Sequence, residues 1–385
     1  MQGILVMDKP AGFTSFDVDA KLRGICRTRR IGHAGTLDPM ATGVLPVFVG
    51  AAARAVDLQQ DHDKTYEAVL RLGMRTDTGD ITGTVLETAP VPASVDAAAV
   101  AAVLPRFAGR SEQLPPMYSA VKVNGQPLYK AARAGRAVER KARPIEIYSL
   151  ELLDADGCGA HEYRLRIACS KGTYVRVLAE DIGAALGVPA VLAALRRTRA
   201  GAYTLAAAHT FAEVEAARAA GTLQSLFLSV DTVFSHLPAV RMDADTCARL
   251  LHGAPSYRFP ARDGEYRLYL DAQARAQLQA AAEAAGGEKA GAAADAAGGS
   301  DRTGETGEAG ETGKSGETGV PAEAKASAEA KAPAEADISA APDAVQTILS
   351  LLAELPAGGF LGVGRVQHGV LSASKLFVER KRETP

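Results

Sequence analysis

Apolar and polar residues alternate with a period of two in two segments of the chain, Lys64–Gly73 and Glu162–Cys169. This alternation predicts strands that bury one face and expose the other. A third strand is predicted over Ile4–Met7, where the residues are continuously apolar. In the first of these segments one face carries Tyr66, Ala68, Leu70 and Leu72.

Helical spacing replaces alternation in two other segments. Thr14 or Ser15 can cap a helix whose apolar face is formed by Val18, Leu22, Ile25 and Cys26. A second helix is predicted over Thr173–Leu186, with Gly187 at the position of a C-terminal cap. Asn124-Gly125 predicts a tight turn. Strands and helices follow one another without a repeating βαβ order, so the pattern predicts an α+β domain with a mixed sheet.

A second, smaller unit is predicted after about Leu237. Its expected elements are a helix capped at Asp243, strands around Tyr257 and over Tyr266–Leu270, a helix over 345–355, and two strands joined by a His368-Gly369 turn. Residues 345–378 are too few to fold alone and too apolar for a solvated tail. They are therefore expected to belong to the same β-rich unit.

Residues 281–344 differ in composition from the rest of the chain. They consist mainly of Ala, Gly, Glu, Thr, Lys and Pro, with no aromatic residue, and predict a disordered insertion. The segment contains thirteen acidic and five basic residues, a net charge of −8, whereas the whole chain carries −2. The remainder therefore carries +6. A moderately basic remainder is compatible with binding to phosphate backbones but occurs in many enzymes.

The four cysteines form no CxxC pair and have no zinc-ligand spacing, so free thiols in a reducing compartment are expected. The N-terminal residues MQGILVMDKPAG lack the features of a signal peptide, and no apolar run is long enough to span a membrane. We therefore expect a cytoplasmic, soluble protein that does not bind membranes.

The segment Gly32–Val47, GHAGTLDPMATGVLPV, is the strongest candidate for chemistry. Its glycines permit tight turns, and a polar loop beside an apolar strand is a common place for functional side chains. From the residues alone a structural role is the more frequent outcome. In that case Asp38 would form a turn before Pro39, and His33 would be an ordinary loop residue.

The segment Ser170–Asp181, SKGTYVRVLAED, is a second candidate. A strand ends in a Lys-Gly turn and a helix begins, so Lys171, Arg176 and the helix amides form a positive corner suited to phosphate or carboxylate. The alternative is a capped helix with a solvated Arg176.

Taken together, these segments resemble the TruB family of bacterial tRNA pseudouridine synthases over about residues 1–235. The similar blocks are MDKPAGFTSFDV, GHAGTLDPMATGVLPV, KTYEAVLRLG, MYSAVKVNGQPLYKAARAG, SKGTYVRVLAEDIG and LRRTRAG. Residues 238–380 are more weakly similar to the family's RNA-binding domain of the PUA type, through RLLHGAP and FLGVGRVQHGVLSASKLF. The insertion at 281–344 departs from the family pattern.

The resemblance implies a pseudouridine-synthase fold with a mixed, mainly antiparallel sheet flanked by helices. It also implies a catalytic domain over 1–236 and a PUA-like RNA-binding domain over 237–385. The implied reaction breaks the N1–C1′ bond of a T-loop uridine, position 55 of tRNA, and rejoins the base through C5. This reaction needs no cofactor or metal.

The resemblance also implies roles for named residues. Asp38 would be the catalytic carboxylate, acting either by attack at C1′ or by removal of the C2′ proton. Arg176 would keep that carboxylate ionised, and Tyr66 would stack on the flipped uridine. His33 would contact displaced nucleotides, whereas Lys9 and Leu195 would shape the pocket.

The expected partner is tRNA, bound by its elbow and acceptor side, with the protein acting as a monomer without a protein partner. Three other hypotheses remain open on the sequence. They are a tRNA-refolding chaperone with catalysis secondary, a guide-dependent synthase, and a small-molecule glycosidase, which would usually require two carboxylates.

Overall fold

The computed structural model describes residues 1–58, 63–123, 125–136, 138–153, 159–278, 280, 355 and 358–378. The chain divides into two compact units, Met1–Ser235 and His236–Pro385. The predicted insertion at 281–344 and the predicted helix at 345–355, apart from Leu355, lie outside the described residues. Among the described helices, none combines the length and the apolar character needed to cross a membrane.

A nine-stranded mixed sheet is the framework of the first unit. Its central path runs β1 (Gly3–Lys9), β3 (Thr42–Val49), β12 (Ala190–Ala200), β4 (Lys64–Leu72), β11 (Glu162–Cys169), β10 (Arg143–Leu152) and β7 (Gly109–Gln113). Two short strands extend it: β2 (Ile31–His33) beside β3, and β13 (Tyr203–Thr204) beside β12. All of these pairs are antiparallel except β12 with β3. The expected mixed, mainly antiparallel α+β fold is confirmed.

The periodic segments form the predicted elements. The predicted face of β4 is buried at every second residue, and β11 spans the predicted residues. Thr14 and Asp17 form a capping box at the start of α1 (Ser15–Cys26). Gly187 ends α4 (Val175–Leu186) in the left-handed conformation, as its position predicted.

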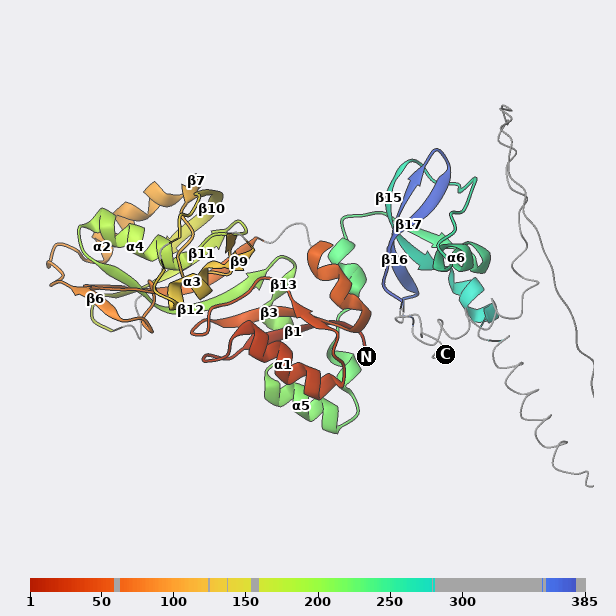
Figure 1. Ribbon diagram of the computed structural model, residues 1–385, viewed down its shortest axis with the longest axis horizontal. Coiled ribbons are helices and arrows are strands. Elements are labelled where there is room, and N and C mark those ends of the chain that lie inside the picture. Colours follow the sequence, from red (N-terminus) through yellow and green to blue (C-terminus); the bar gives the residue numbers. More distant parts are fainter. Residues whose placement is uncertain are drawn as a thin grey trace, which may run out of the picture. The chain divides into compact units, whose positions relative to one another are not determined.

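The first unit also contains further short elements. Among them are α2 (Ala97–Val103), α3 (Leu128–Arg133), α5 (Phe211–Ala219), the 3-10 helix η1 (Gly50–Leu58), and the hairpins β5 (Met74–Thr76) with β6 (Val85–Thr88) and β8 (Lys122–Val123) with β9 (Gln126–Pro127). Asn124, in the predicted tight turn, lies outside the described residues, whereas the β8–β9 pairing on either side of it is present. Figure 1 shows α2 and α4 near one end of the sheet and α1 and α5 near the other.

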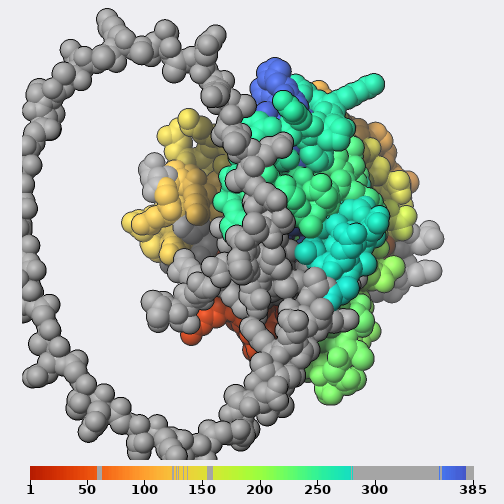
Figure 2. Space-filling model, turned by 90° about the vertical axis from the view of Figure 1, so that its right-hand side faces the viewer, coloured from red at the N-terminus to blue at the C-terminus, as the bar shows by residue number. Residues whose placement is uncertain are grey.

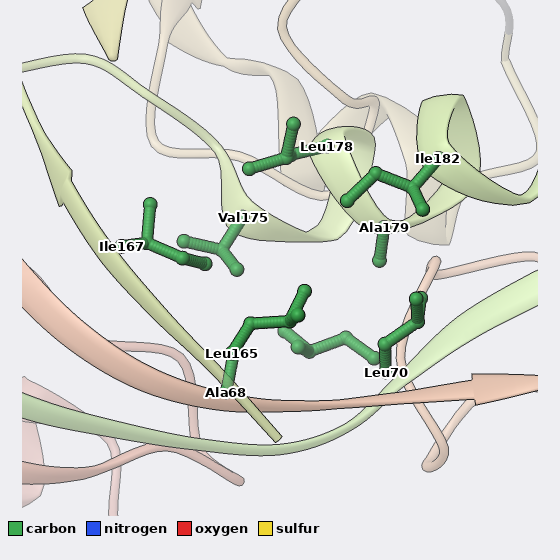
Figure 3. A pocket seen from close by; sticks show the side chains of 9 residues that line it. Ala68, Leu70, Leu165, Ile167, Val175, Leu178, Ala179 and Ile182 are labelled. Atoms are coloured by element: carbon green, nitrogen blue, oxygen red, sulfur yellow. The ribbon is translucent and has the colours of Figure 1, made fainter. Parts of the chain in front are cut away.

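Helix α4 packs on the sheet through its apolar face, and this contact positions the first turn of the helix. Val175, Leu178, Ala179 and Ile182 face side chains of β4, β11 and β12 around an apolar void of about 10 Å³ (Figure 3). The void has room for about one water molecule and has no polar lining, so we expect it to be dry. The packing therefore fixes the helix start by apolar contact.

The second unit contains a four-stranded sheet in the order β14 (Ala239–Met242), β15 (Gly264–Leu270), β16 (Phe360–Gln367) and β17 (Val370–Leu376). Asp243 caps α6 (Ala244–Leu251), and His368 and Gly369 join β16 to β17 with positive φ angles, as predicted. Figure 2 shows the blue strands of this unit beside its green-cyan residues.

The predicted strand around Tyr257 is wrong. Only Ser256 forms an isolated bridge, to Leu371, and Arg258 has a φ of 56°. Proline residues at 255 and 260 flank this short segment, and a residue with positive φ interrupts extended pairing.

Candidate active site

The loop between β2 and β3 carries Asp38. The buried Arg197 side chain holds this loop and the strand after it with two hydrogen bonds. Its Nη2 donates to the carbonyl of Gly35 in the loop at 2.8 Å, and its Nε donates to the carbonyl of Val44 in β3 at 2.7 Å. Gly43 has a φ of 98°, and a Cβ there would overlap the Arg197 carbonyl oxygen. Glycine is therefore required where β3 meets β12.

Asp38 forms a two-pronged ion pair with Arg176 in the first turn of α4. Arg176 Nε lies 2.9 Å from Asp38 Oδ2, and Arg176 Nη2 donates to Asp38 Oδ1 at 3.1 Å. The two residues are 138 positions apart in the chain. A planar guanidinium matches both oxygens of a carboxylate, so the pair fixes the orientation of Asp38 as well as its charge.

The same guanidinium is held by two backbone carbonyls. Nη1 donates to Thr78 O at 2.9 Å, and Nη2 donates to Tyr118 O at 2.8 Å. The Arg176 side chain is 4% exposed, whereas that of Asp38 is 35% exposed. The arginine is therefore an internal support, and the carboxylate is accessible to a ligand.

Burial raises the pKa of Asp38 above the ordinary value of an aspartate. The positive charge of Arg176 opposes this rise, whereas the carboxylate of Asp80 adds to it. Asp80 Oδ2 lies 4.0 Å from Arg176 Nε, so two carboxylates share one guanidinium. The positive charge of Arg176 therefore neutralises the negative charge of Asp38 only in part.

Tyr66 lies on β4, directly across from Arg197 on β12. The Tyr66 side chain is buried, and its burial raises the pKa of the phenol to about 12. Arg197 Nη1 has no hydrogen-bond partner within the part of the chain that the structure describes, and the positive charge of the guanidinium opposes the rise in the pKa of Tyr66. Tyr66 is therefore a neutral phenol at pH 7, beside a buried positive charge.

Lys9, at the end of β1, is fully buried and braces the same loop. Its ammonium donates to the carbonyls of Phe13, Pro10 and Pro39 at 2.6, 3.0 and 3.2 Å. Burial lowers the pKa of Lys9 to about 8, and the negative charge of Asp38 opposes this shift. Lys9 therefore positions Pro39, the residue after Asp38, and its positive charge acts on the Asp38 carboxylate.

The other predicted site residues lie around this centre. His33 ends β2, and its ring nitrogens lie 2.8 Å from Asp19 Oδ2 and 3.2 Å from Thr36 Oγ1. Leu195 is buried on β12 opposite Ala68, and Lys171 is exposed in the turn before α4. The roles of these three residues in binding RNA remain predictions.

Sequence reasoning missed three charged or aromatic groups near Asp38. Arg197 lies within the LRRTRAG block and Asp80 within the polar run 76–84, but no local pattern shows which charged residue of a polar run is buried. Tyr174 caps α4 and has a pKa raised by burial, with Arg176 and Asp38 among the charges that act on it. Tyr174 lies inside the candidate segment Ser170–Asp181, two residues before Arg176, and this closeness in sequence could have marked it as a site residue.

Asp38 is the accessible acidic group of this centre and could act on a sugar or a base as nucleophile or proton acceptor. The described residues contain no group of three or more His, Cys, Asp or Glu side chains arranged to hold a metal ion. Cys26, Cys169 and Cys247 are buried free thiols, and Cys158 lies outside the described residues.

Two family descriptions match adjacent parts of the chain. The N-terminal domain of TruB family pseudouridylate synthases matches residues 23–175, and the C-terminal domain of tRNA pseudouridylate synthase B matches residues 176–235. The boundary between the two matches falls in the first turn of α4, between Val175 and Arg176.

Curated relatives named tRNA pseudouridine synthase B are similar over most of their length. The relative from Pseudomonas putida is 46% identical over 256 residues, which are 66% of this chain and 82% of the relative. The relative from Dechloromonas aromatica is 45% identical over 273 residues, 71% of this chain and 89% of the relative.

Solved structures with a similar fold include chains of two multi-component assemblies. A chain of a Cbf5-Nop10-Gar1 complex is 26% identical with a TM-score of 0.51, covering 70% of this chain and 74% of that chain. A chain of an H/ACA RNP bound to a substrate RNA containing 2′-deoxyuridine is 25% identical with a TM-score of 0.50, over the same shares of the two chains.

Proposed function

The chain belongs to the TruB family and isomerises uridine in tRNA to pseudouridine, and from this premise we propose that Asp38 is the carboxylate that performs the reaction. The observation that supports this role is the accessible Asp38 carboxylate held by two bonds from the buried Arg176. We propose the T-loop uridine at position 55 as its target.

The reaction exchanges one bond for another within the same nucleotide. The N1–C1′ bond breaks, the uracil turns while it stays bound, C5 bonds to C1′, and the proton on C5 is lost while N1 gains one. Positive character develops on the sugar as the first bond breaks, and a carboxylate beside C1′ and C2′ stabilises it. Asp38 then either bonds to C1′ or takes the C2′ proton, and its partial neutralisation leaves it reactive for both.

Arg176 keeps this carboxylate oriented through the whole cycle. Its two bonds to Asp38 and two bonds to backbone carbonyls leave it little freedom to move. Preorganised charges of this kind contribute to catalysis because they need not rearrange when the sugar becomes positive. Arg176 is therefore a positioning residue.

Tyr66 is proposed to stack on the uracil that enters the pocket. The target nucleotide must leave its base stack before Asp38 can reach its sugar. A neutral aromatic ring on strand β4 can then replace the lost stacking contact of the displaced uracil. A second proposed role is to act on a proton in the rearrangement, because the Arg197 charge beside the phenol favours its ionised form.

We further propose that the protein acts in the cytoplasm as a monomer without a protein partner. In this proposal Met1–Ser235 contains the catalytic machinery, and His236–Pro385 is a PUA-like unit that binds the acceptor side of the same tRNA. The excess of basic residues outside 281–344 supports binding to the RNA backbone.

The test is incubation of the purified protein with an unmodified tRNA transcript, without cofactor or added metal, followed by carbodiimide mapping of pseudouridine. Asp38→Asn is tested in parallel. One new pseudouridine at position 55 that is absent with the variant supports the proposal. Tight tRNA binding without modification would instead favour a refolding chaperone, and modification by the variant would exclude the proposed role of Asp38.

A further inference from the structure

Phe16 is an exposed aromatic residue that contacts His33, the residue at the start of the loop that carries Asp38. It lies in the first turn of α1 and is 66% exposed, although it is a large apolar side chain. Its ring meets the imidazole of His33 edge to face, with the centroids 5.1 Å apart and the planes at 80°. The contact covers one part of the ring, and most of the remainder faces solvent.

The imidazole that supports Phe16 is itself immobilised. A carboxylate only accepts hydrogen bonds, so His33 Nδ1 carries a proton and donates to Asp19 Oδ2 at 2.8 Å. Thr36 Oγ1 lies 3.2 Å from the other ring nitrogen, and the His33 and Asp19 side chains are only 6% and 3% exposed. Phe16 therefore rests on a rigid group.

Two bracing contacts tie the start of α1 to the Asp38 loop. Ser15 Oγ accepts from Leu37 N at 2.9 Å and donates to Leu37 O at 3.2 Å. Lys9 Nζ donates hydrogen bonds to the carbonyls of both Phe13 and Pro39, and so links the two segments. Each contact links a residue close to Phe16 with a neighbour of Asp38 in the chain, so the helix start that carries Phe16 is fixed relative to the Asp38 loop.

We propose that Phe16 is a stacking site for one unpaired nucleobase of the tRNA, separate from the pocket that takes the target uridine. The inference rests on tRNA as the substrate, and on the bonds that join the start of α1 to both neighbours of Asp38 in the chain. Nucleobases are flat and aromatic, and a base stacks on an exposed aromatic ring without regard to its sequence.

The first experiment compares Phe16→Ala with wild type for tRNA affinity and turnover. Removing a stacking ring weakens binding by about 10- to 100-fold. We expect this loss in Kd and KM, with kcat at saturating tRNA reduced less than about threefold. Phe16→Tyr, which keeps the ring, is expected to recover most of the affinity. Leu86→Ala is the matched control, because Leu86 is 56% exposed on β6, away from α1 (Figure 1).

The second experiment identifies the partner as a base. A T-arm hairpin is prepared with an abasic site at one loop position at a time, excluding the target. One abasic position should weaken wild-type binding about as much as Phe16→Ala does, and combining the two should cause no further loss. Equal sensitivity of Phe16→Ala and wild type at every position would overturn the inference.

The chain contains no tryptophan, so Phe16→Trp provides a single fluorescent reporter at this site. Its emission should be quenched as tRNA binds, whereas that of Leu86→Trp should change little. Normal affinity of Phe16→Ala together with unquenched Phe16→Trp would refute stacking while leaving the modification activity intact. Failure of the wild type to bind or modify tRNA would instead refute the proposed function.

Discussion

Arg176→Lys tests whether the geometry of the guanidinium, and not only its charge, positions Asp38. Lysine keeps the positive charge but offers one ammonium group, whereas Arg176 donates to both Asp38 oxygens and to the carbonyls of Thr78 and Tyr118. A lysine that reaches Asp38 cannot also satisfy two carbonyls on different segments. At least one buried carbonyl then loses its donor.

The stability change follows from these lost bonds. A buried polar group without its partner costs about 1–3 kcal/mol, so we expect the free energy of unfolding to fall by about that amount. For a unit of this size the fall corresponds to a Tm lower by roughly 2–12 °C. Loss of a preorganised contact at the reacting group is expected to lower kcat by about 100- to 1,000-fold.

The pH dependence gives an independent readout. Burial raises the pKa of Asp38, and Arg176 opposes that rise. A weaker pair in Arg176→Lys leaves the pKa higher, and turnover requires the ionised carboxylate. The acid limb of the pH profile of kcat should therefore move to higher pH, so that activity is lost at a pH where the wild type is still active.

The assay is single-turnover conversion of a tRNA transcript at saturating enzyme, combined with thermal unfolding. Arg110→Lys is the matched control, because Arg110 is 87% exposed and pairs with Glu146 at 3.3 Å. An exposed pair of this kind contributes less than about 1 kcal/mol, so neither Tm nor kcat should change appreciably. If Arg176→Lys kept kcat within about threefold and an unshifted acid limb, the positioning role of the guanidinium would be refuted.

Three further predictions concern the carboxylate, the RNA and the loop. Asp38→Asn should abolish turnover while the tRNA Kd stays within a few-fold, because the group serves the reaction more than binding; a matching loss of affinity in filter binding would indicate a structural Asp38. The tRNA affinity should fall steeply as salt rises from low to physiological concentration, and a flat titration would contradict backbone binding by basic residues. Gly43→Ala should destabilise the first unit by several kcal/mol, because its Cβ would overlap the Arg197 carbonyl at a φ of 98°; an unchanged melting curve would show that β3 and β12 can separate locally.

Local pattern determined much of the secondary structure. Alternation in Lys64–Leu72 and Glu162–Cys169 specified two strands, because a half-buried strand requires side chains of opposite character on its two faces. The capping residues at Thr14 and Gly187 marked two helix ends, because they satisfy backbone groups that a helix leaves free. The strand predicted around Tyr257 was wrong, since one left-handed residue suffices to interrupt pairing.

The sequence by itself identified Asp38 and Arg176 as candidates, because each stands in a compact polar run beside a turn. The family resemblance implied that Arg176 pairs with Asp38, and the tertiary structure brings the two side chains together. Strand β12 lies between β3 and β4, and the register places Arg197 beside both Gly43 and Tyr66. Contacts between residues more than a hundred positions apart depend on the order of strands in the sheet, which local hydrophobic spacing does not encode. The same long-range packing buries Arg197 and brings Asp80 to Arg176, so the charge balance at Asp38 exists only in the folded chain.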